Sequence, residues 1–289
     1  MSREEHSAHS YLRPTKKFPN VWCSGCGIGI VMSALIRAID RMELDKNEVA
    51  LVSGIGCTGR MPVYLDFNTM HTTHGRALAF ATGLKIALPK MNVIVIMGDG
   101  DALAIGGNHF IHAARRNIDL NVIVVNNSIY GMTGGQYSPT TPLDSRATTA
   151  PYGNIEQPFP ICELAIAAGA SYVARSTVYH AVELDRMIEQ AIRKNGFSLV
   201  EVASYCHTTF GRINKLGSAV DMMRRLKDNS VTLTAAEKLA PEERASKIVR
   251  GVFCDLVRPG YIELYDQVIQ RAQAASGGEV RIREVAGGN

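Results

Sequence analysis

The sequence predicts an α/β protein whose parallel β-sheet is sandwiched by helices. Two apolar runs, at residues 93–97 and 122–125, flank a helix-compatible segment and form a strand, loop, helix, strand unit. Each run ends in a polar loop, GDG at residues 98–100 and NN at residues 126–127. Because parallel sheets bind ligands outside the carboxyl ends of their strands, these loops predict a binding site at one sheet edge.

The composition is that of an ordinary globular protein. The 289 residues are 46% hydrophobic, which is enough for one large core or two small ones. The formal charge of +4 is modest and unclustered, so we expect no nucleic-acid partner, although a weakly basic surface would suit an acidic protein. The sequence has neither a signal-peptide-like start nor eighteen consecutive apolar residues. We therefore expect no membrane association and a cytoplasmic location.

The two polar loops have the chemistry of a magnesium diphosphate site. Magnesium prefers six hard oxygen ligands, of which carboxylates and phosphates supply several. Asp99 could offer a carboxylate oxygen, Asn127 an amide oxygen and Ile129 its backbone carbonyl. Gly98 and Gly100 would let the backbone approach the phosphates closely. The alternative is a tight strand-to-helix turn followed by an Asn-rich turn.

The N-terminal third combines a polar arm with three cysteines. Residues 1–20 look irregular, and a helix is expected over 28–42. Cys23 and Cys26 precede that helix as a Cys-x-x-Cys pair, which suits a redox dithiol, half a zinc site or half an iron–sulfur site. Cys57 follows a buried strand predicted at 49–53, at the same sheet edge as the polar loops.

Two histidines lie ahead of an alanine-rich helix expected over 76–88. His71 and His74 have no third ligand at suitable spacing, so zinc is not expected there. His74 could instead form a hydrogen bond to a cofactor, the alternative being a structural histidine at a helix start.

The second half alternates helices and strands after a long loop. Residues 129–154 are rich in Gly, Pro, Ser and Thr, and such long loops are usually functional. Further elements are expected as helices over 161–169 and 180–194 and strands over 172–175 and 197–203, the last of these being the final clear strand. That strand delivers Cys206 to the sheet edge that already holds Cys57, Asp99 and Asn127. Convergence of four candidate ligands predicts one site.

Three regions follow from this pattern. Residues 1–20 form an arm, residues 21–216 one domain, and residues 217–289 a C-terminal extension that packs on the domain or on a partner chain. A terminal helix is expected over residues 260–275.

Several of these motifs together resemble a known family. WCSGCG, SGIGC, HTTHGRALAFATG, GDGDALAIGGNHFIHAARRN, NNSIYGMTGGQYSPTTP and EVASYCHT occur in this order over about residues 20–215. They are similar to the beta subunit of the 2-oxoacid:ferredoxin oxidoreductases, and most to the 2-oxoglutarate type. The resemblance implies the thiamine diphosphate (ThDP) binding fold, with ThDP, Mg²⁺ and one 4Fe-4S cluster as cofactors.

The resemblance also implies a role for individual residues. It makes the cluster ligands Cys23, Cys26, Cys57 and Cys206, and the magnesium ligands Asp99, Asn127 and Ile129. The ThDP site would be lined by Ile55, Gly56, Cys57, Thr58, His74, Gly98, Gly100, Asp101, Gly131 and Met132. Cys162 and Cys254 match no ligand position and are interpreted as buried structural thiols. Family members often have proline where this chain has His207.

The implied activity is the reversible oxidative decarboxylation of 2-oxoglutarate to succinyl-CoA and CO₂, with coenzyme A and ferredoxin as co-substrates. An alpha subunit would complete the active site, in a heterodimer or a dimer of heterodimers. His74 and Arg60 are the candidate catalytic side chains, and Arg60 could face the distal carboxylate of the substrate.

Other functions stay open on the sequence alone. A pyruvate or broad 2-oxoacid enzyme would carry the same motifs. A non-redox ThDP decarboxylase could bind structural zinc on its cysteines, and an electron-transfer subunit could hold a cluster without ThDP.

Overall fold

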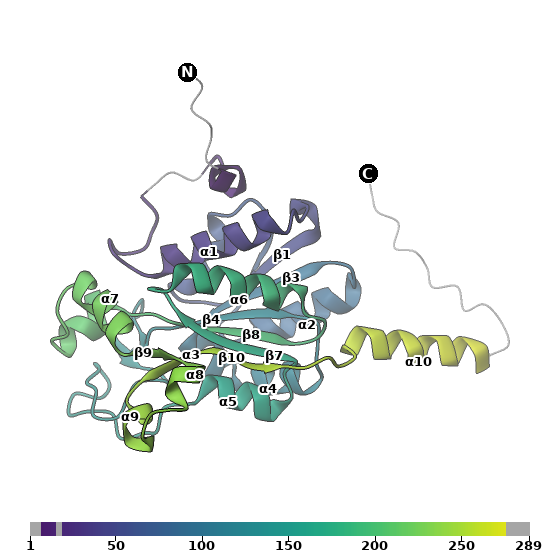
Figure 1. Cartoon of the computed structure of the whole chain (residues 1–289). Coiled ribbons are helices and arrows are strands. Elements are labelled where there is room, and N and C mark those ends of the chain that lie inside the picture. The colour runs from purple at the N-terminus through teal and green to yellow at the C-terminus, as the bar shows by residue number, and fades with distance from the viewer. Residues whose placement is uncertain (1–6, 16–18, 276–289) are drawn as a thin grey trace.

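The computed structural model describes residues 7–15 and 19–275, and its centre is an eight-stranded sheet in the order β2-β1-β3-β4-β8-β7-β10-β9 (Figure 1). Its strands are β1 (Val49–Ser53), β2 (Asn68–His71), β3 (Asn92–Gly98), β4 (Asn121–Asn126), β7 (Tyr172–Thr177), β8 (Ser198–Ala203), β9 (Ser230–Thr232) and β10 (Ile248–Asp255). The strands from β2 to β7 pair in parallel. The predicted α/β class with a parallel sheet is therefore confirmed for this part of the sheet.

Helices cover both faces of the sheet. They are α1 (Ile28–Arg41), α2 (Ala77–Ala87), α3 (Asp99–Leu103), α4 (Gly107–Arg115), α5 (Ile161–Ala168), α6 (Ala181–Arg193), α7 (Ala219–Asp228), α8 (Leu233–Ala236), α9 (Pro241–Ala245) and α10 (Tyr261–Ala275). Short 3₁₀ helices are η1 (Ser7–Tyr11), η2 (Lys46–Glu48) and η3 (Thr58–Val63), and a π-helical turn is η4 (His207–Gly211). A small hairpin, β5 (Ile129–Tyr130) and β6 (Gln136–Tyr137), lies in the long loop.

Two apolar cores sit on opposite faces of the sheet because alternate strand residues point to opposite sides. In β3, Ile94 and Ile96 pack in the core under α1 and α6, whereas Val93 and Val95 pack in the core under α2, α4 and α5. Burial on both faces explains why the strands read as continuous apolar runs.

The C-terminal extension departs from the sequence prediction. Residues 197–203 are not the last strand, because β10 pairs antiparallel with β7 and β9 pairs in parallel with β10. The pairing of β10 shifts register between Val252 and Cys254. The extension thus packs on the domain by joining its sheet, while the domain limits at residues 21 and 216 stay predictions.

Two further segments differ from expectation. The strand β2 has no counterpart in the sequence prediction, and it is a polar edge strand paired with β1. The N-terminal arm is irregular only in part. Its described residues include the helix η1, and Leu12 forms an isolated antiparallel β-bridge with Leu65 of the domain. Residues 1–6 and 16–18 of that arm lie outside the described residues.

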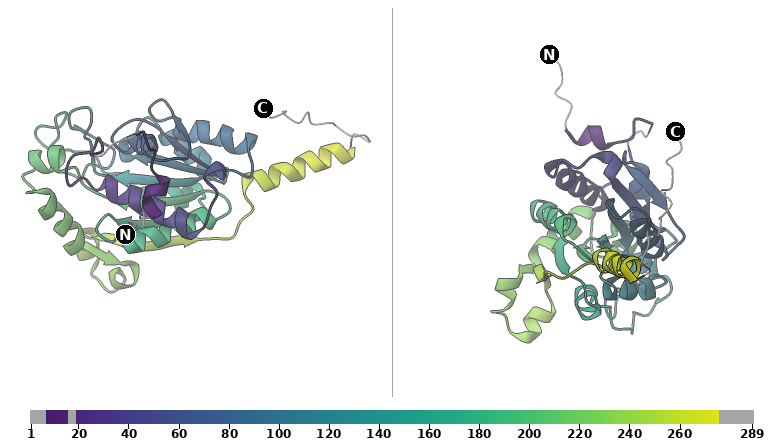
Figure 2. Two further views of the ribbon diagram at one scale, coloured as in Figure 1. Left: turned by 90° about the horizontal axis from the view of Figure 1, so that it is seen from above. Right: turned by 90° about the vertical axis from the view of Figure 1, so that its right-hand side faces the viewer.

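The helix α10 extends away from the rest of the molecule on the side opposite α7 (Figures 1 and 2). Asp255, the last residue of β10, pairs with Tyr172, the first residue of β7, so α10 leaves from the amino-end edge of the parallel strands. The candidate site lies at the other edge. Within residues 7–15 and 19–275, no helix has the length and apolar character needed to cross a membrane.

Candidate active site

A cavity opens at the carboxyl edge of the sheet, where the loops after β1, β3 and β4 meet. All ten residues predicted to line a ThDP site line this cavity, and so do the three predicted magnesium ligands. Tyr130 and Thr133 line it as well, although the sequence did not single them out. The structure therefore brings the predicted cofactor residues together, as the strand-edge argument requires.

Asp99 is held by two hydroxyl groups from the long loop. Its Oδ2 accepts hydrogen bonds from Ser138 Oγ at 2.5 Å and from Thr140 Oγ1 at 2.6 Å. The side chain is only 3% exposed, and this burial raises the pKa of its carboxyl group, although both hydrogen bonds oppose the rise. A bound cation would favour the ionised form, so this buried carboxylate is suited to metal binding.

The turn after β4 presents the other two candidate ligands. Asn126 Oδ1 accepts from the Ser128 backbone N–H at 3.2 Å, and Asn127 Oδ1 accepts from the Ile129 N–H at 3.3 Å. Ser128 has a φ of 60°, in the left-handed region. These contacts fold the chain sharply, so that Asn127 and Ile129 both reach the cavity.

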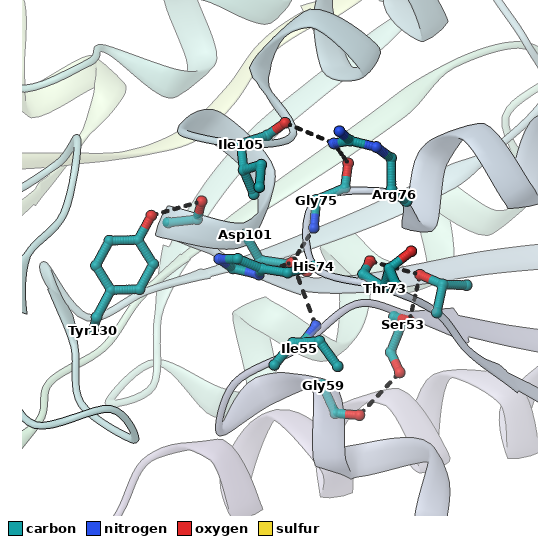
Figure 3. A network of polar contacts seen from close by, with 12 residues as sticks. Ser53, Ile55, Gly59, Thr73, His74, Gly75, Arg76, Asp101, Ile105 and Tyr130 are labelled. Carbon is teal, nitrogen blue, oxygen red and sulfur yellow. Dashed lines mark hydrogen bonds and ion pairs between the residues drawn. The ribbon is translucent and has the colours of Figure 1, made fainter.

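Asp101 forms a clamp with the loops after β1 and β2 (Figure 3). Its Oδ1 accepts from His74 Nδ1 at 2.6 Å, from the Gly75 N–H at 2.7 Å and from the Ile55 N–H at 3.3 Å. Its Oδ2 is buried without a hydrogen-bond partner. A carboxylate accepts from several donors, so one side chain fixes the backbone at two positions of the cavity wall.

Gly54 and Gly100 must be glycine because neighbouring side chains lie very close to their Cα atoms. A Cβ on Gly54 would lie 2.6 Å from Asp101 Cγ, and a Cβ on Gly100 would lie 2.6 Å from Tyr130 Oη. Tyr130 donates to the Gly100 carbonyl at 3.1 Å (Figure 3), and burial raises the pKa of its phenol to about 12. Both positions therefore exclude any side chain larger than hydrogen.

A second cavity is lined by four cysteines. Cys23, Cys26, Cys57 and Cys206 all line it, together with apolar side chains that include Val21 and Trp22. Trp22 Nε1 donates to the Cys57 carbonyl at 2.8 Å. Thr208 Oγ1 lies 3.7 Å from the sulfur of Cys23 and 3.6 Å from that of Cys206.

The four thiols influence one another electrostatically. Burial raises the pKa of Cys26 to about 11, and the other three cysteines add to the rise as nearby thiolates. Burial, followed by Cys206 and Cys23, also raises the pKa of Cys57. Across residues 7–15 and 19–275, however, no three His, Cys, Asp or Glu side chains are grouped closely enough to hold a single metal ion. The four cysteines instead line one cavity.

The two cavities adjoin. Cys57, Asn127, Gly131 and Met132 line both of them. A Cβ on Gly131 would lie 3.1 Å from Cys206 Sγ, so glycine keeps the separating wall thin at this point.

Four other residues that the sequence analysis discussed lie outside the first cavity. Arg60 is exposed in η3 and does not line the first cavity. His207 lines the cysteine cavity, with its ring 6.3 Å from that of Tyr205. Cys162 is fully buried, as expected for a structural thiol, whereas Cys254 is only half-buried.

Ser138 and Thr140 are the functional candidates that the sequence reasoning missed. They lie in the long loop, whose departure from the Asn-Asn turn indicated a functional segment but not which hydroxyl groups return to Asp99. The run Ser-Pro-Thr-Thr at 138–141 was the available signal, because three hydroxyl side chains in a loop beside a predicted metal site are potential hydrogen-bond donors.

Comparisons with known proteins agree with this geometry. Residues 54–202 match the family model described as thiamine pyrophosphate enzyme, C-terminal TPP binding domain. The chain is 50% identical over 269 residues to the 2-oxoglutarate synthase subunit KorB of Methanocaldococcus jannaschii, covering 93% of this chain and 99% of that protein. It is 46% identical over 191 residues to the 2-oxoacid:ferredoxin oxidoreductase subunit beta of Saccharolobus solfataricus, covering 65% of this chain and 63% of that protein. The chain belongs to the beta subunits of the 2-oxoacid:ferredoxin oxidoreductases.

A solved structure supports the same assignment of this beta subunit. The 2-oxoglutarate:ferredoxin oxidoreductase from Magnetococcus marinus, with 2-oxoglutarate, coenzyme A and succinyl-CoA bound, matches with a TM-score of 0.82 and 31% identity. The match covers 98% of this chain and 94% of that chain. The family resemblance and the ThDP-binding fold predicted for this beta subunit are therefore confirmed.

Proposed function

We propose that this beta subunit holds ThDP, Mg²⁺ and one 4Fe-4S cluster in a cytoplasmic 2-oxoglutarate:ferredoxin oxidoreductase. The reaction is the reversible, coenzyme-A-dependent conversion of 2-oxoglutarate to succinyl-CoA and CO₂, with ferredoxin as the electron acceptor. The observation that carries the proposal is the shared wall of the two cavities, which would place a decarboxylation site directly beside a one-electron carrier. When bound, ThDP supplies the electron sink for decarboxylation.

The first cavity fits a magnesium diphosphate. Asp99, Asn127 and the Ile129 carbonyl offer three hard oxygen ligands, and the diphosphate and a water would complete the octahedron. A side chain on Gly100 would clash with the Tyr130 ring, and glycine at this position lets the backbone approach the phosphates closely. The unpartnered Asp101 Oδ2 is a further polar atom that a bound cofactor could satisfy.

The His74 ring is held by Asp101 in a position from which it could contact the cofactor. Its Nδ1 must carry the proton that is shared with Asp101 Oδ1, because an ionised carboxylate only accepts hydrogen bonds. The Nε2 atom takes no part in this contact, and the ring lines the cavity. Asp101 therefore fixes the orientation of the His74 ring in the cavity wall.

The second cavity fits a bulky iron–sulfur cluster better than a zinc ion. A zinc site needs its ligands about 2.3 Å from one point, and no such group of three occurs in the described part of the chain. Four cysteines that line one cavity are the ligand set of a 4Fe-4S cluster. The raised thiol pKa values of Cys26 and Cys57 mean that cluster binding releases protons from these two residues, as expected when metal replaces hydrogen on sulfur.

The choice of 2-oxoglutarate over pyruvate is supported by the relatives. Several are named 2-oxoglutarate synthase subunits, among them a protein of Archaeoglobus fulgidus that is 57% identical over 219 residues. We retain Arg60 as a candidate for binding the distal carboxylate, in a pocket completed by the alpha subunit, because it is exposed at the carboxyl edge of the sheet three residues after Cys57.

The test is reconstitution with the alpha subunit. The co-purified complex is assayed with coenzyme A, a viologen acceptor and a panel of 2-oxoacids, beside the beta subunit alone. We expect turnover only in the complex, with 2-oxoglutarate preferred, and Asp99→Ala should abolish it together with ThDP binding. Equal turnover of pyruvate would favour a broad 2-oxoacid enzyme. Turnover by the beta subunit alone would refute the division of the active site between two chains.

The metal content is tested on the same preparation. We expect four iron and four acid-labile sulfide per beta subunit from the cluster type, with loss of both in Cys26→Ser. Stoichiometric zinc without sulfide would show a structural metal instead. The mass of the complex distinguishes a heterodimer from a dimer of heterodimers.

A further inference from the structure

A buried ion pair lies in the sheet beneath the candidate magnesium site. Glu201, on the central strand β8, is 3% exposed, and its Oε2 accepts from Arg175 Nε at 2.7 Å. Cys162 Sγ lies 3.3 Å from the same oxygen. Replacing a buried ion pair by apolar side chains often leaves a protein as stable or makes it more so. Glu201 therefore calls for an explanation other than stability.

The other carboxylate oxygen of Glu201 connects to the turn after β4. In the parallel pairing of β4 with β8, Glu201 is opposite Val124, so Asn126 is its diagonal neighbour on the same face. Glu201 Oε1 accepts from Asn126 Nδ2 at 3.0 Å. Since a carboxylate only accepts hydrogen bonds, this contact fixes the orientation of the Asn126 amide group. The NH₂ group must face Glu201, and Oδ1 must face the site.

Asn126 Oδ1 lies close to two segments of the candidate metal site, the turn after β4 and the loop residue Thr140. It accepts from the Ser128 N–H at 3.2 Å, which shapes the turn that carries Asn127 and Ile129. It also lies 2.9 Å from Thr140 Oγ1, whose single proton can go to this oxygen or to Asp99 Oδ2 at 2.6 Å, but not to both at once. One amide oxygen thus shapes the turn that carries two candidate ligands and lies beside the hydroxyl group that contacts the third.

We propose that Glu201 and Asn126 are positioning residues for the magnesium diphosphate. Glu201, anchored by Arg175, fixes the orientation of the Asn126 amide, and the amide oxygen holds the turn that carries Asn127 and Ile129. This inference rests on the proposed function, because it concerns the affinity of the metal site in that proposal.

The informative variant is Glu201→Gln, which keeps the shape of the side chain. Its single amide oxygen is needed by the Arg175 guanidinium, so its NH₂ group faces the NH₂ group of Asn126. Two donors cannot bond to each other, so the Asn126 amide turns over and presents a donor to the Ser128 N–H. The turn then loses its support while the ligands themselves are unchanged.

The assay measures metal binding rather than turnover. The complex of the full chain with its alpha subunit is freed of magnesium and titrated with Mn²⁺ at saturating ThDP, and free Mn²⁺ is followed by electron paramagnetic resonance. We expect the Kd for Mn²⁺ to rise roughly 10- to 100-fold in Glu201→Gln, as is common when the partner of a metal ligand is lost. Cys162→Ala is the matched control, because Cys162 contacts Glu201 but not Asn126. Its Kd should be unchanged.

Two more variants keep the inference testable if Glu201→Gln does not fold. Asn126→Ala removes the amide without leaving a buried charge unpaired, and should weaken Mn²⁺ binding to a similar degree. Adding Asn126→Asp to Glu201→Gln restores a donor–acceptor pair and should recover most of the affinity, whereas Asn126→Asp alone places two carboxylates together and should not.

The outcomes separate this inference from the proposed function. A wild-type complex without ThDP-dependent Mn²⁺ binding would overturn both. Normal wild-type binding, with folded Glu201→Gln or Asn126→Ala binding equally well, would overturn the positioning role alone. Recovery in Asn126→Asp by itself would show that added charge, and not amide orientation, controls the affinity.

Discussion

Replacing Gly54 by alanine should break the clamp that Asp101 forms across the cavity wall. The new Cβ would lie 2.6 Å from Asp101 Cγ, and carbon atoms pack best about 3.5 Å apart. The carboxyl group would have to retreat by the difference, about 0.9 Å. A displacement of that size is enough to break its hydrogen bonds to His74 Nδ1 at 2.6 Å and to the Gly75 N–H at 2.7 Å.

The size of the effect follows from these two contacts. Hydrogen bonds to a charged group contribute about 1.5–3 kcal/mol each, so losing both predicts a decrease of about 3–6 kcal/mol in the free energy of unfolding. Urea unfolding of the full chain, with the midpoint and slope measured together, tests this value. The cofactor-free chain is used because bound groups would complicate a two-state analysis.

Two controls identify the cause. Gly83 is exposed on α2, and a Cβ added there would have no other atom within 4 Å. Gly83→Ala should therefore raise stability by about 0.5–1 kcal/mol. In an Asp101→Gly background, Gly54→Ala should cost less than about 1 kcal/mol, since the clashing group is gone. A loss below about 1 kcal/mol for Gly54→Ala alone would refute the clamp.

Three further predictions concern pH, thiol reactivity and substrate choice. Burial raises the pKa of the Asp101 carboxyl group, so the folded state binds its proton more tightly than the unfolded state. The stability of the wild type therefore falls as pH rises from about 3.8 through the raised value. The stability of Asp101→Asn relative to wild type should increase over that pH range, and a constant difference would contradict this. The pKa of Cys162 is raised well above its usual range by burial and by Glu201, so iodoacetamide should label it only after unfolding, and labelling at the rate of exposed Cys23 would disprove its burial. Arg60→Ala should reduce the preference for 2-oxoglutarate over pyruvate with ThDP binding intact, and an unchanged preference would remove Arg60 from the substrate site.

The central part of the fold could be predicted because its signals are local and strong. Strands buried on both faces read as apolar runs, and the loops after them carry the chemistry, so the meeting of Cys57, Asp99, Asn127 and Cys206 at one edge followed from strand direction alone.

The missed elements depend on contacts that the sequence does not reveal. β2 is polar and largely exposed, and its backbone pairing with β1 leaves no apolar pattern. β10 contains Arg250 and Gly251 and shifts register near Cys254, which interrupts its periodicity. The return of the 138–141 segment to Asp99 spans about forty residues of chain, so no short-range rule could find it.

The Glu201 and Asn126 pair could be predicted from the sequence only in part. A charged residue in an apolar strand conflicts with the local pattern, and such conflicts tend to mark functional positions. The sequence alone could have raised that question for Glu201, but only the register of β4 against β8 identifies Asn126 as its partner.

The most direct test of the account is whether substrate reduces the cluster within the complex. The complex with ThDP, Mg²⁺ and coenzyme A is mixed with 2-oxoglutarate in the absence of ferredoxin, and the cluster is followed by electron paramagnetic resonance at low temperature. We predict that a signal of a reduced 4Fe-4S cluster develops with 2-oxoglutarate and is absent in Asp99→Ala. Consumption of 2-oxoglutarate with an unchanged cluster would contradict the claim that the two adjoining cavities form one redox site.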